Sequence, residues 1–112
     1  MPYIDPSSRA KINPDIDRLA DSIAAEVINE GDETAYAGKL TYTITRLSLL
    51  VIKKIFGTKL KFFNIALLPG LMEIVKLEFY ERIGAEAERD KRRLNGDVDV
   101  IEDFQEELEL HW

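Results

Sequence analysis

Hydrophobic residues recur along most of the chain at the three- and four-residue spacing that marks one face of an α-helix. The first such stripe follows Asn13–Pro14, an N-cap residue with proline at the first helical position, and continues to Ile28. Residues 29–38 contain Gly31, Asp32 and Gly38 and predict a loop. A second stripe covers residues 39–56 and stops at Gly57. The pattern therefore predicts two amphipathic helices joined by a loop.

The first half of the second stripe is also compatible with a β-strand. It holds Thr41, Thr43 and Thr45, and β-branched residues favour strands over helices. The apolar spacing continues as far as Ile55, however, and a regular pattern of this length favours a helix.

The third apolar segment spans residues 59–94 and contains Pro69 near its middle. Because proline lacks an amide hydrogen and clashes with the preceding turn, we predict a kink or a break at Leu68-Pro69-Gly70. The segment ends at Asn95–Gly96, which is a typical helix stop. Beyond it, helical spacing of apolar residues in the acidic tail predicts a short helix that would be marginal alone: Val100, Ile101, Phe104 and Leu108.

These elements predict an all-α fold: a compact bundle of three main helices, the third kinked at Pro69, plus a short C-terminal helix. We assign residues 1–98 to a single helical domain, because a chain of 112 residues is too short for two independent cores. Residues 99–112 form an acidic tail that can supply a short docking helix.

The second and third helices are apolar around much of their circumference, which is more than so few helices can cover. We therefore expect a homo-oligomer, a dimer or higher, with a monomeric bundle as the alternative. The longest apolar run is too short and too interrupted to span a bilayer, so we expect no membrane partner. The N-terminal residues lack the pattern of a signal peptide and the chain has no cysteine, so we expect a cytoplasmic location. With no cysteine, the chain has no disulfides and no thiolate metal ligands.

Charge is distributed unevenly along the chain. Residues 97–112 contain seven acidic residues and no lysine or arginine, so the rest of a chain with net charge -6 sums to +1. Binding to a nucleic-acid backbone requires a clustered positive field, and the acidic tail would compete for the cations of residues 89–93. We therefore do not expect nucleic acid as a partner.

Two glutamates give the chain one candidate metal site. Glu78 and Glu81 form an E-x-x-E pair, which places two carboxylates on adjacent helical turns, as helical bundles do when they bind Mg²⁺. MazG-like nucleotide pyrophosphohydrolases have such a pair but add an E-x-x-D from a second helix, which this chain lacks. A degenerate Mg²⁺-dependent hydrolase of this kind is an alternative. The common interpretation is surface ion pairing of the glutamates with Lys76 and Arg82.

A second candidate site is a polar pocket where the second and third helices cross. Arginine together with tyrosine and asparagine is suited to bind a phosphate or a base. The same residues can instead link helices or subunits through hydrogen bonds and ion pairs. The single histidine, His111, is next to last in the chain, so we expect no histidine-dependent catalysis. The candidate ligand-binding residues are Tyr42, Thr45, Arg46, Asn64, Lys76, Tyr80 and Arg82.

Four sequence blocks carry a family resemblance: MPYIDP at the start, TITRL over residues 43–47, VKLEFYER over residues 75–82 and NGDV over residues 95–98. Together they resemble a family of small proteins from tailed bacteriophages and prophages that has no established activity. The family pattern lacks the acidic tail from Val100 onward.

This resemblance implies a phage-encoded protein in the host cytoplasm. We expect a non-enzymatic homo-oligomer that binds a host protein or sequesters a small anionic, nucleotide-like ligand. The alternatives are the Mg²⁺-dependent hydrolase, or a structural component of the virion or of its assembly. Under the non-enzymatic interpretation we expect no cofactor.

Overall fold

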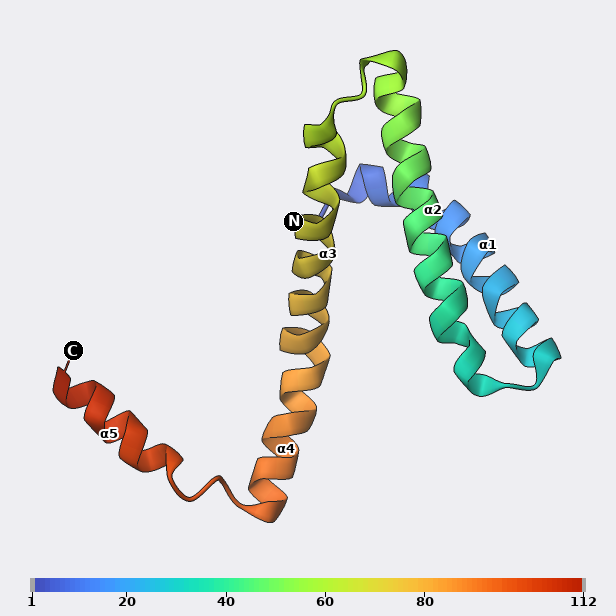
Figure 1. Ribbon diagram of the computed structural model, residues 1–112. Helices are drawn as coiled ribbons and strands as arrows, with labels where there is room; N and C mark the ends of the chain where they lie inside the picture. The colour runs from blue at the N-terminus through green and yellow to red at the C-terminus, as the bar shows by residue number, and fades with distance from the viewer. Residues whose placement is uncertain (1, 112) are drawn as a thin grey trace. The chain divides into compact units, whose positions relative to one another are not determined.

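The computed structural model describes the backbone of residues 2–111 (Figure 1). It describes the side chains of residues 2–108. Every regular element in this part of the chain is helical, which confirms the predicted all-α class. The α-helices are α1 (Pro6–Glu30), α2 (Tyr36–Phe56), α3 (Phe62–Phe79), α4 (Ala85–Asn95) and α5 (Ile101–His111). Three shorter elements lie between them, the 3-10 helices η1 (Glu33–Ala35) and η2 (Gly57–Lys59) and the π-helix η3 (Tyr80–Gly84).

The chain divides into two units, Met1–Met72 and Glu73–Trp112. The first unit contains α1, α2 and the first part of α3. The second contains the end of α3 with η3, α4 and α5.

Helix α1 begins eight residues earlier than the sequence pattern predicts, and the predicted start at Asn13–Pro14 is wrong. The N-cap is Asp5, whose carboxylate accepts hydrogen bonds from the Ser7 hydroxyl (2.7 Å) and the Ser8 amide (2.9 Å). These bonds, that from the Ser7 hydroxyl first, lower the pKa of Asp5 because they stabilise the ionised form. Pro6 occupies the first helical position, and Pro14 lies inside the helix, where it leaves one carbonyl without its amide partner.

The connection between α1 and α2 is shorter than the predicted loop over residues 29–38. Gly31 ends α1 in the left-handed conformation (φ 72°, ψ 12°), and its amide donates to the carbonyl of Ile28. The Asp32 carboxylate then accepts from both the hydroxyl and the amide of Thr34 and begins η1. The Thr34 hydroxyl, followed by its amide, lowers the pKa of Asp32. This local capping turns the chain within a few residues.

Helices α1 and α2 pack against each other as a hairpin (Figure 1). Lys39 of α2 links them on the polar side, since its ammonium group lies 2.7 Å from Glu30 and 3.5 Å from Glu26. The hydrogen bond to Glu30 is the main cause of a raised pKa at Lys39, although partial desolvation opposes it.

Helix α2 confirms the predicted helix over residues 39–56 and its end at Gly57. The β-branched residues at its start are accommodated because their hydroxyls bond to backbone carbonyls one turn back: Thr41 to Ala37, Thr43 to Lys39 and Thr45 to Thr41. Gly57 has a positive φ of 53°, which suits a residue without a side chain.

Of the kink or break predicted at Pro69, the break is wrong, because α3 continues through this residue from Phe62 to Phe79. The kink at Pro69 stays a prediction. The irregular turn lies further along, at η3, where the Ala85 amide donates to the carbonyl of Tyr80. The predicted stop at Asn95–Gly96 is confirmed: Gly96 has φ 86° and its amide bonds to the Arg92 carbonyl at 2.9 Å. The predicted tail helix is present as α5.

No residue between 2 and 108 is buried in the single chain. The predicted compact bundle assumed that one chain encloses a core, and neither unit does so by itself. The physical reason in the first unit is that α2 and α3 are joined by η2 but make no helix-to-helix backbone contact, so the apolar faces of the α1–α2 hairpin are covered on one side only.

Candidate functional site

The first candidate surface is a shallow polar patch on α2. Tyr42, Thr45 and Arg46 line it together with Leu49, Leu50 and Lys53, and its volume is about 280 Å³. These positions lie on successive turns of one helix face. Because the Thr45 hydroxyl donates to the Thr41 carbonyl at 2.7 Å, it can only accept from a ligand. Tyr42, Arg46 and Lys53 are therefore the donors that this patch can offer.

The segment of the chain that contains this patch has positive side chains and no acidic ones. No aspartate or glutamate occurs in residues 34–72, whereas six lysines or arginines do. Arg46 makes no ion pair among the described residues. An anion at the patch would meet attraction from Arg46 and Lys53 without a competing carboxylate from the same segment.

Asn64, which we predicted in the same pocket, has a local role instead. Its side-chain oxygen accepts from the Lys61 amide at 2.9 Å and so satisfies a backbone donor at the start of α3. Asn64 also lines a separate apolar groove of about 380 Å³ between α2 and α3. The structure thus separates Asn64 from the Tyr42–Thr45–Arg46 patch.

The remaining predicted ligand-binding residues lie in the second unit. Lys76 pairs with Glu73 at 3.4 Å, and the Arg82 guanidinium lies 3.9 Å from Glu78. Both are contacts between residues three or four positions apart on an exposed helix, where ion pairs contribute about 0.3–0.5 kcal/mol at most. Lys76 and Arg82 therefore form surface ion pairs, as the second interpretation of these residues expected.

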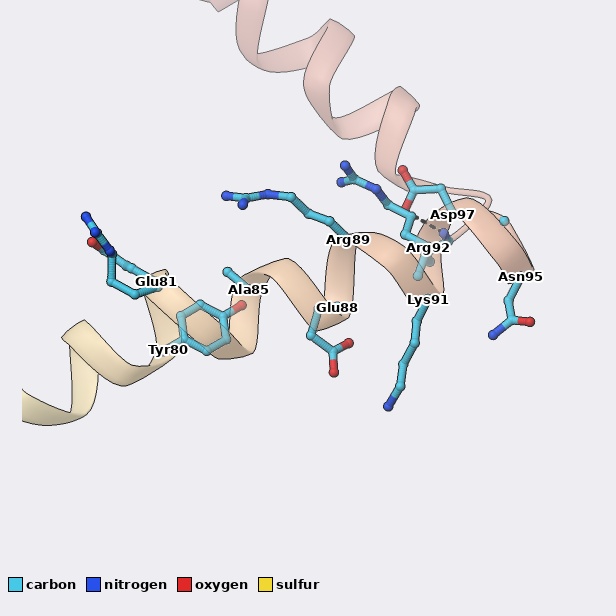
Figure 2. Close-up of a pocket in the computed structure, with 12 residues that line it drawn as sticks. Tyr80, Glu81, Ala85, Glu88, Arg89, Lys91, Arg92, Asn95 and Asp97 are labelled. Carbon is cyan, nitrogen blue, oxygen red and sulfur yellow. Dashed lines mark hydrogen bonds between the residues drawn. The ribbon is translucent and has the colours of Figure 1, made fainter.

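Tyr80 and Arg82 also line an open groove of about 820 Å³ along η3 and α4 (Figure 2). Four cationic and three acidic side chains surround it. Figure 2 shows Arg89 and Arg92 extending to one side of α4, and Glu88 and Lys91 to the other. The charges therefore spread around the helix rather than converge on one point, and Arg89 is further occupied by Glu86 at 2.7 Å.

The candidate metal ligands are two carboxylates without a third. Glu78 faces Arg82, and Glu81 lines the groove along η3 and α4. Within the described residues, no group of three histidine, cysteine, aspartate or glutamate side chains is close enough to hold an ion. Mg²⁺ bound by two glutamates alone would keep most of its water shell and bind weakly.

Sequence reasoning missed three surfaces. Two are apolar grooves, one of about 370 Å³ between α1 and α2 near Ile23 and Tyr36, the other the α2–α3 groove that Asn64 lines. The third is the segment joining α2 to α3, residues 53–63, which we name the basic tip. It combines four lysines with exposed apolar side chains: Phe62 is 83% exposed, Ile55 67% and Phe63 66%. The signal for this tip is in the sequence, as the run without acidic residues.

No α-helix of the described chain is both long enough and apolar enough to cross a membrane.

No curated protein and no solved structure matches the chain. One protein family matches residues 1–98, which is most of the chain, and the match ends before the first residue of α5. On this match the chain belongs to the family described as "Domain of unknown function (DUF6899)".

Proposed function

We propose that the protein is a non-enzymatic binding protein that works as a homo-oligomer and completes its hydrophobic core by associating with further copies of itself. The observation that carries this proposal is the absence of any buried residue between 2 and 108, in a chain with 46% hydrophobic residues. A chain of this composition gains too little from burial as a single copy to offset its loss of conformational entropy.

The α2–α3 groove supports this assembly. Its walls are almost wholly apolar and include Leu47, Val51, Ile52, Leu67 and Leu71. Apolar surface gains about 25 cal/mol per Å² when it leaves water, and a standard interface buries about 800 Å² on each partner. An apolar helix face from a second copy would complete this groove into a packed core. We therefore propose that the helical bundle forms between copies and not within one chain.

The ligand that we propose is a small anion, nucleotide-like in chemistry, at the Tyr42–Thr45–Arg46 patch. The support is the arginine free of ion pairs within the described chain, next to a tyrosine that can stack on a base or donate to a phosphate. We also propose that the protein is encoded by a phage, acts in the host cytoplasm and has a host protein as a further partner.

Sedimentation velocity tests the assembly. We expect the intact protein to sediment as a dimer or larger, and Leu71→Asp to sediment as a monomer, because a carboxylate in the apolar groove costs several kcal/mol on association. Leu94→Asp is the matched control, since Leu94 lies on α4 and is 84% exposed. Leu71→Ala, which removes contacts without adding charge, guards against simple unfolding. A folded monomeric wild type would refute the proposal.

Fluorescence anisotropy with a labelled nucleoside triphosphate tests the ligand. Arg46→Ala should weaken binding at least tenfold, which corresponds to one charge-assisted contact of about 1.4 kcal/mol or more. Arg46→Lys should recover only part of it, because lysine keeps the charge but loses the bidentate geometry. Arg18→Ala removes an arginine of α1 that already pairs with Asp15 and should leave binding unchanged. Equal binding by Arg46→Ala would exclude the patch.

A further inference from the structure

Helix α5 belongs to the second unit, together with η3 and α4. Within the described chain it makes no backbone contact with either of these two elements. It is 11 residues long, and an isolated helix of this length is marginal in water. Its apolar positions, Ile101, Phe104 and Leu108, follow one another at three- and four-residue spacing and are all partly or largely exposed. Such a helix becomes stable when its apolar face finds a surface to cover it.

The rest of α5 is strongly acidic. Glu102, Asp103, Glu106, Glu107 and Glu109 lie on this helix, and Asp97 and Asp99 precede it. The partner of α5 should therefore combine exposed apolar side chains with several positive charges and should lack carboxylates, which would repel the helix.

The basic tip, residues 53–63, has this combination. Its four lysines, Lys53, Lys54, Lys59 and Lys61, make no ion pair within the described chain. Its aromatic side chains are exposed, and no acidic residue lies nearer in the sequence than Glu33 or Glu73. The tip and α5 are thus matched both in charge and in apolar character.

We infer that α5 of one copy docks on the basic tip of a second copy, so that the tail helix forms one of the contacts that hold the oligomer together. This inference rests on the proposed homo-oligomer. The aromatic side chains of the tip cover Ile101, Phe104 and Leu108, while the lysines pair with the carboxylates on either side of that apolar face. The matched family region ends at residue 98, before α5 begins.

In the proposed homo-oligomer every copy has both a basic tip and an α5. A second copy therefore supplies the surface that is complementary to α5 in charge and in apolar character.

Energy transfer between labelled copies tests the contact in the full-length protein. The chain has no natural cysteine, so T58C in the tip and Q105C in α5 each provide a single labelling site. A donor is attached to T58C chains and an acceptor to Q105C chains, and the two are mixed, so that any transfer is between copies. We expect transfer that weakens as salt rises.

Charge reversal then identifies the interacting residues. E102K with E106K in the acceptor chain should weaken the apparent affinity about tenfold, and K54E with K59E in the donor chain should restore it. D17K with D21K on α1 changes the net charge equally and should have no such effect. Transfer that ignores the α5 reversal, or is not restored by the exchange, would refute the contact.

Sedimentation of the same samples separates failure of this inference from failure of the proposed function. An oligomer without transfer would refute the docking of α5 and leave the homo-oligomer standing, whereas a monomer would refute both. Flotation with vesicles that contain phosphatidylserine examines the competing partner. If the wild type floats as strongly as the E102K/E106K variant, the tip is free to bind anionic lipid and the inference is wrong.

Discussion

The start of α1 depends on a choice between two nearly identical signals. Asp5–Pro6 and Asn13–Pro14 both place a capping side chain before a proline, and the sequence pattern after Asn13 is the more regular. The difference lies in the two residues after the first proline, because Ser7 and Ser8 both donate to the Asp5 carboxylate and give that cap more bonds. Residues before the apolar stripe can thus be helical although they bury nothing, because capping alone stabilises the first turn.

Two glycines should respond in opposite ways to alanine. Gly31→Ala should destabilise by about 1 kcal/mol, because the residue has a φ of 72° that alanine adopts poorly. Gly84→Ala should stabilise by about 0.5–1 kcal/mol, because its φ of -62° suits alanine. The new methyl meets the Tyr80 ring at 3.3 Å and lies in ordinary contact, at 3.9 Å, with the Phe79 carbonyl oxygen.

Urea unfolding of both variants beside the wild type measures these changes. Tyr80 is 56% exposed, so its ring can move by the few tenths of an ångström required. A loss of stability in Gly84→Ala would mean that a partner fixes the ring, whereas an unchanged Gly31→Ala would contradict the left-handed cap.

At the scale of elements, the sequence indicates helices better than it indicates breaks. The helix over residues 39–56, the stops at Gly57 and Gly96 and the tail helix all arise from local signals, and all are present. Pro69 does not break α3, because one proline removes only one hydrogen bond and the flanking apolar residues still favour the helix. The π-turn at Tyr80–Gly84 has no comparable signal in the sequence.

The α1–α2 hairpin should depend on Lys39 in a pH-dependent way. Its raised folded-state pKa means that the ion pairs with Glu26 and Glu30 stabilise the hairpin fully below the ordinary value of 10.5. This contribution is lost as the pH rises above 10.5 and passes through the folded pKa. We therefore expect Lys39→Met to unfold at lower urea than the wild type at neutral pH, with a difference that shrinks in strong base.

Lys91→Met is the control for this experiment, because Lys91 makes no ion pair within the described chain. A difference between Lys39→Met and the wild type that stays constant from neutral pH to pH values well above 10.5 would contradict the role given to the ammonium group.

At the scale of the whole molecule, the spacing of residues in the sequence does not identify what the exposed polar and apolar surfaces bind. The polar candidates Tyr42, Thr45 and Arg46 lie together because they share a helix face, which spacing predicts. Asn64, Lys76 and Arg82 are occupied by neighbours within four residues, which spacing also allows, so periodicity alone could not choose between the two interpretations. Under the proposed homo-oligomer the core depends on a second chain, and the spacing of residues in one sequence does not specify how two chains pack.

A homo-oligomer makes the thermal midpoint depend on protein concentration. For a dimer, each tenfold increase in concentration adds about 1.4 kcal/mol to the free energy of unfolding, which raises the midpoint by several degrees in a chain of this size. Calorimetry over two decades of concentration measures this shift. A midpoint that does not move would indicate a monomer, or an oligomer that stays associated after unfolding.

The segregation of charge along the chain has a consequence for how many copies assemble. The only long stretch without acidic residues, residues 34–72, and the acidic run after Gly96 lie on different segments of the chain. In the inferred contact each copy therefore has one docking helix, α5, and one surface that binds it, the basic tip. Two copies that each dock α5 on the tip of the other form a closed dimer with two contacts, and neither contact remains open for a third copy. If copies dock head to tail instead, each addition leaves one α5 and one tip exposed, and growth continues as a filament whose length salt would limit.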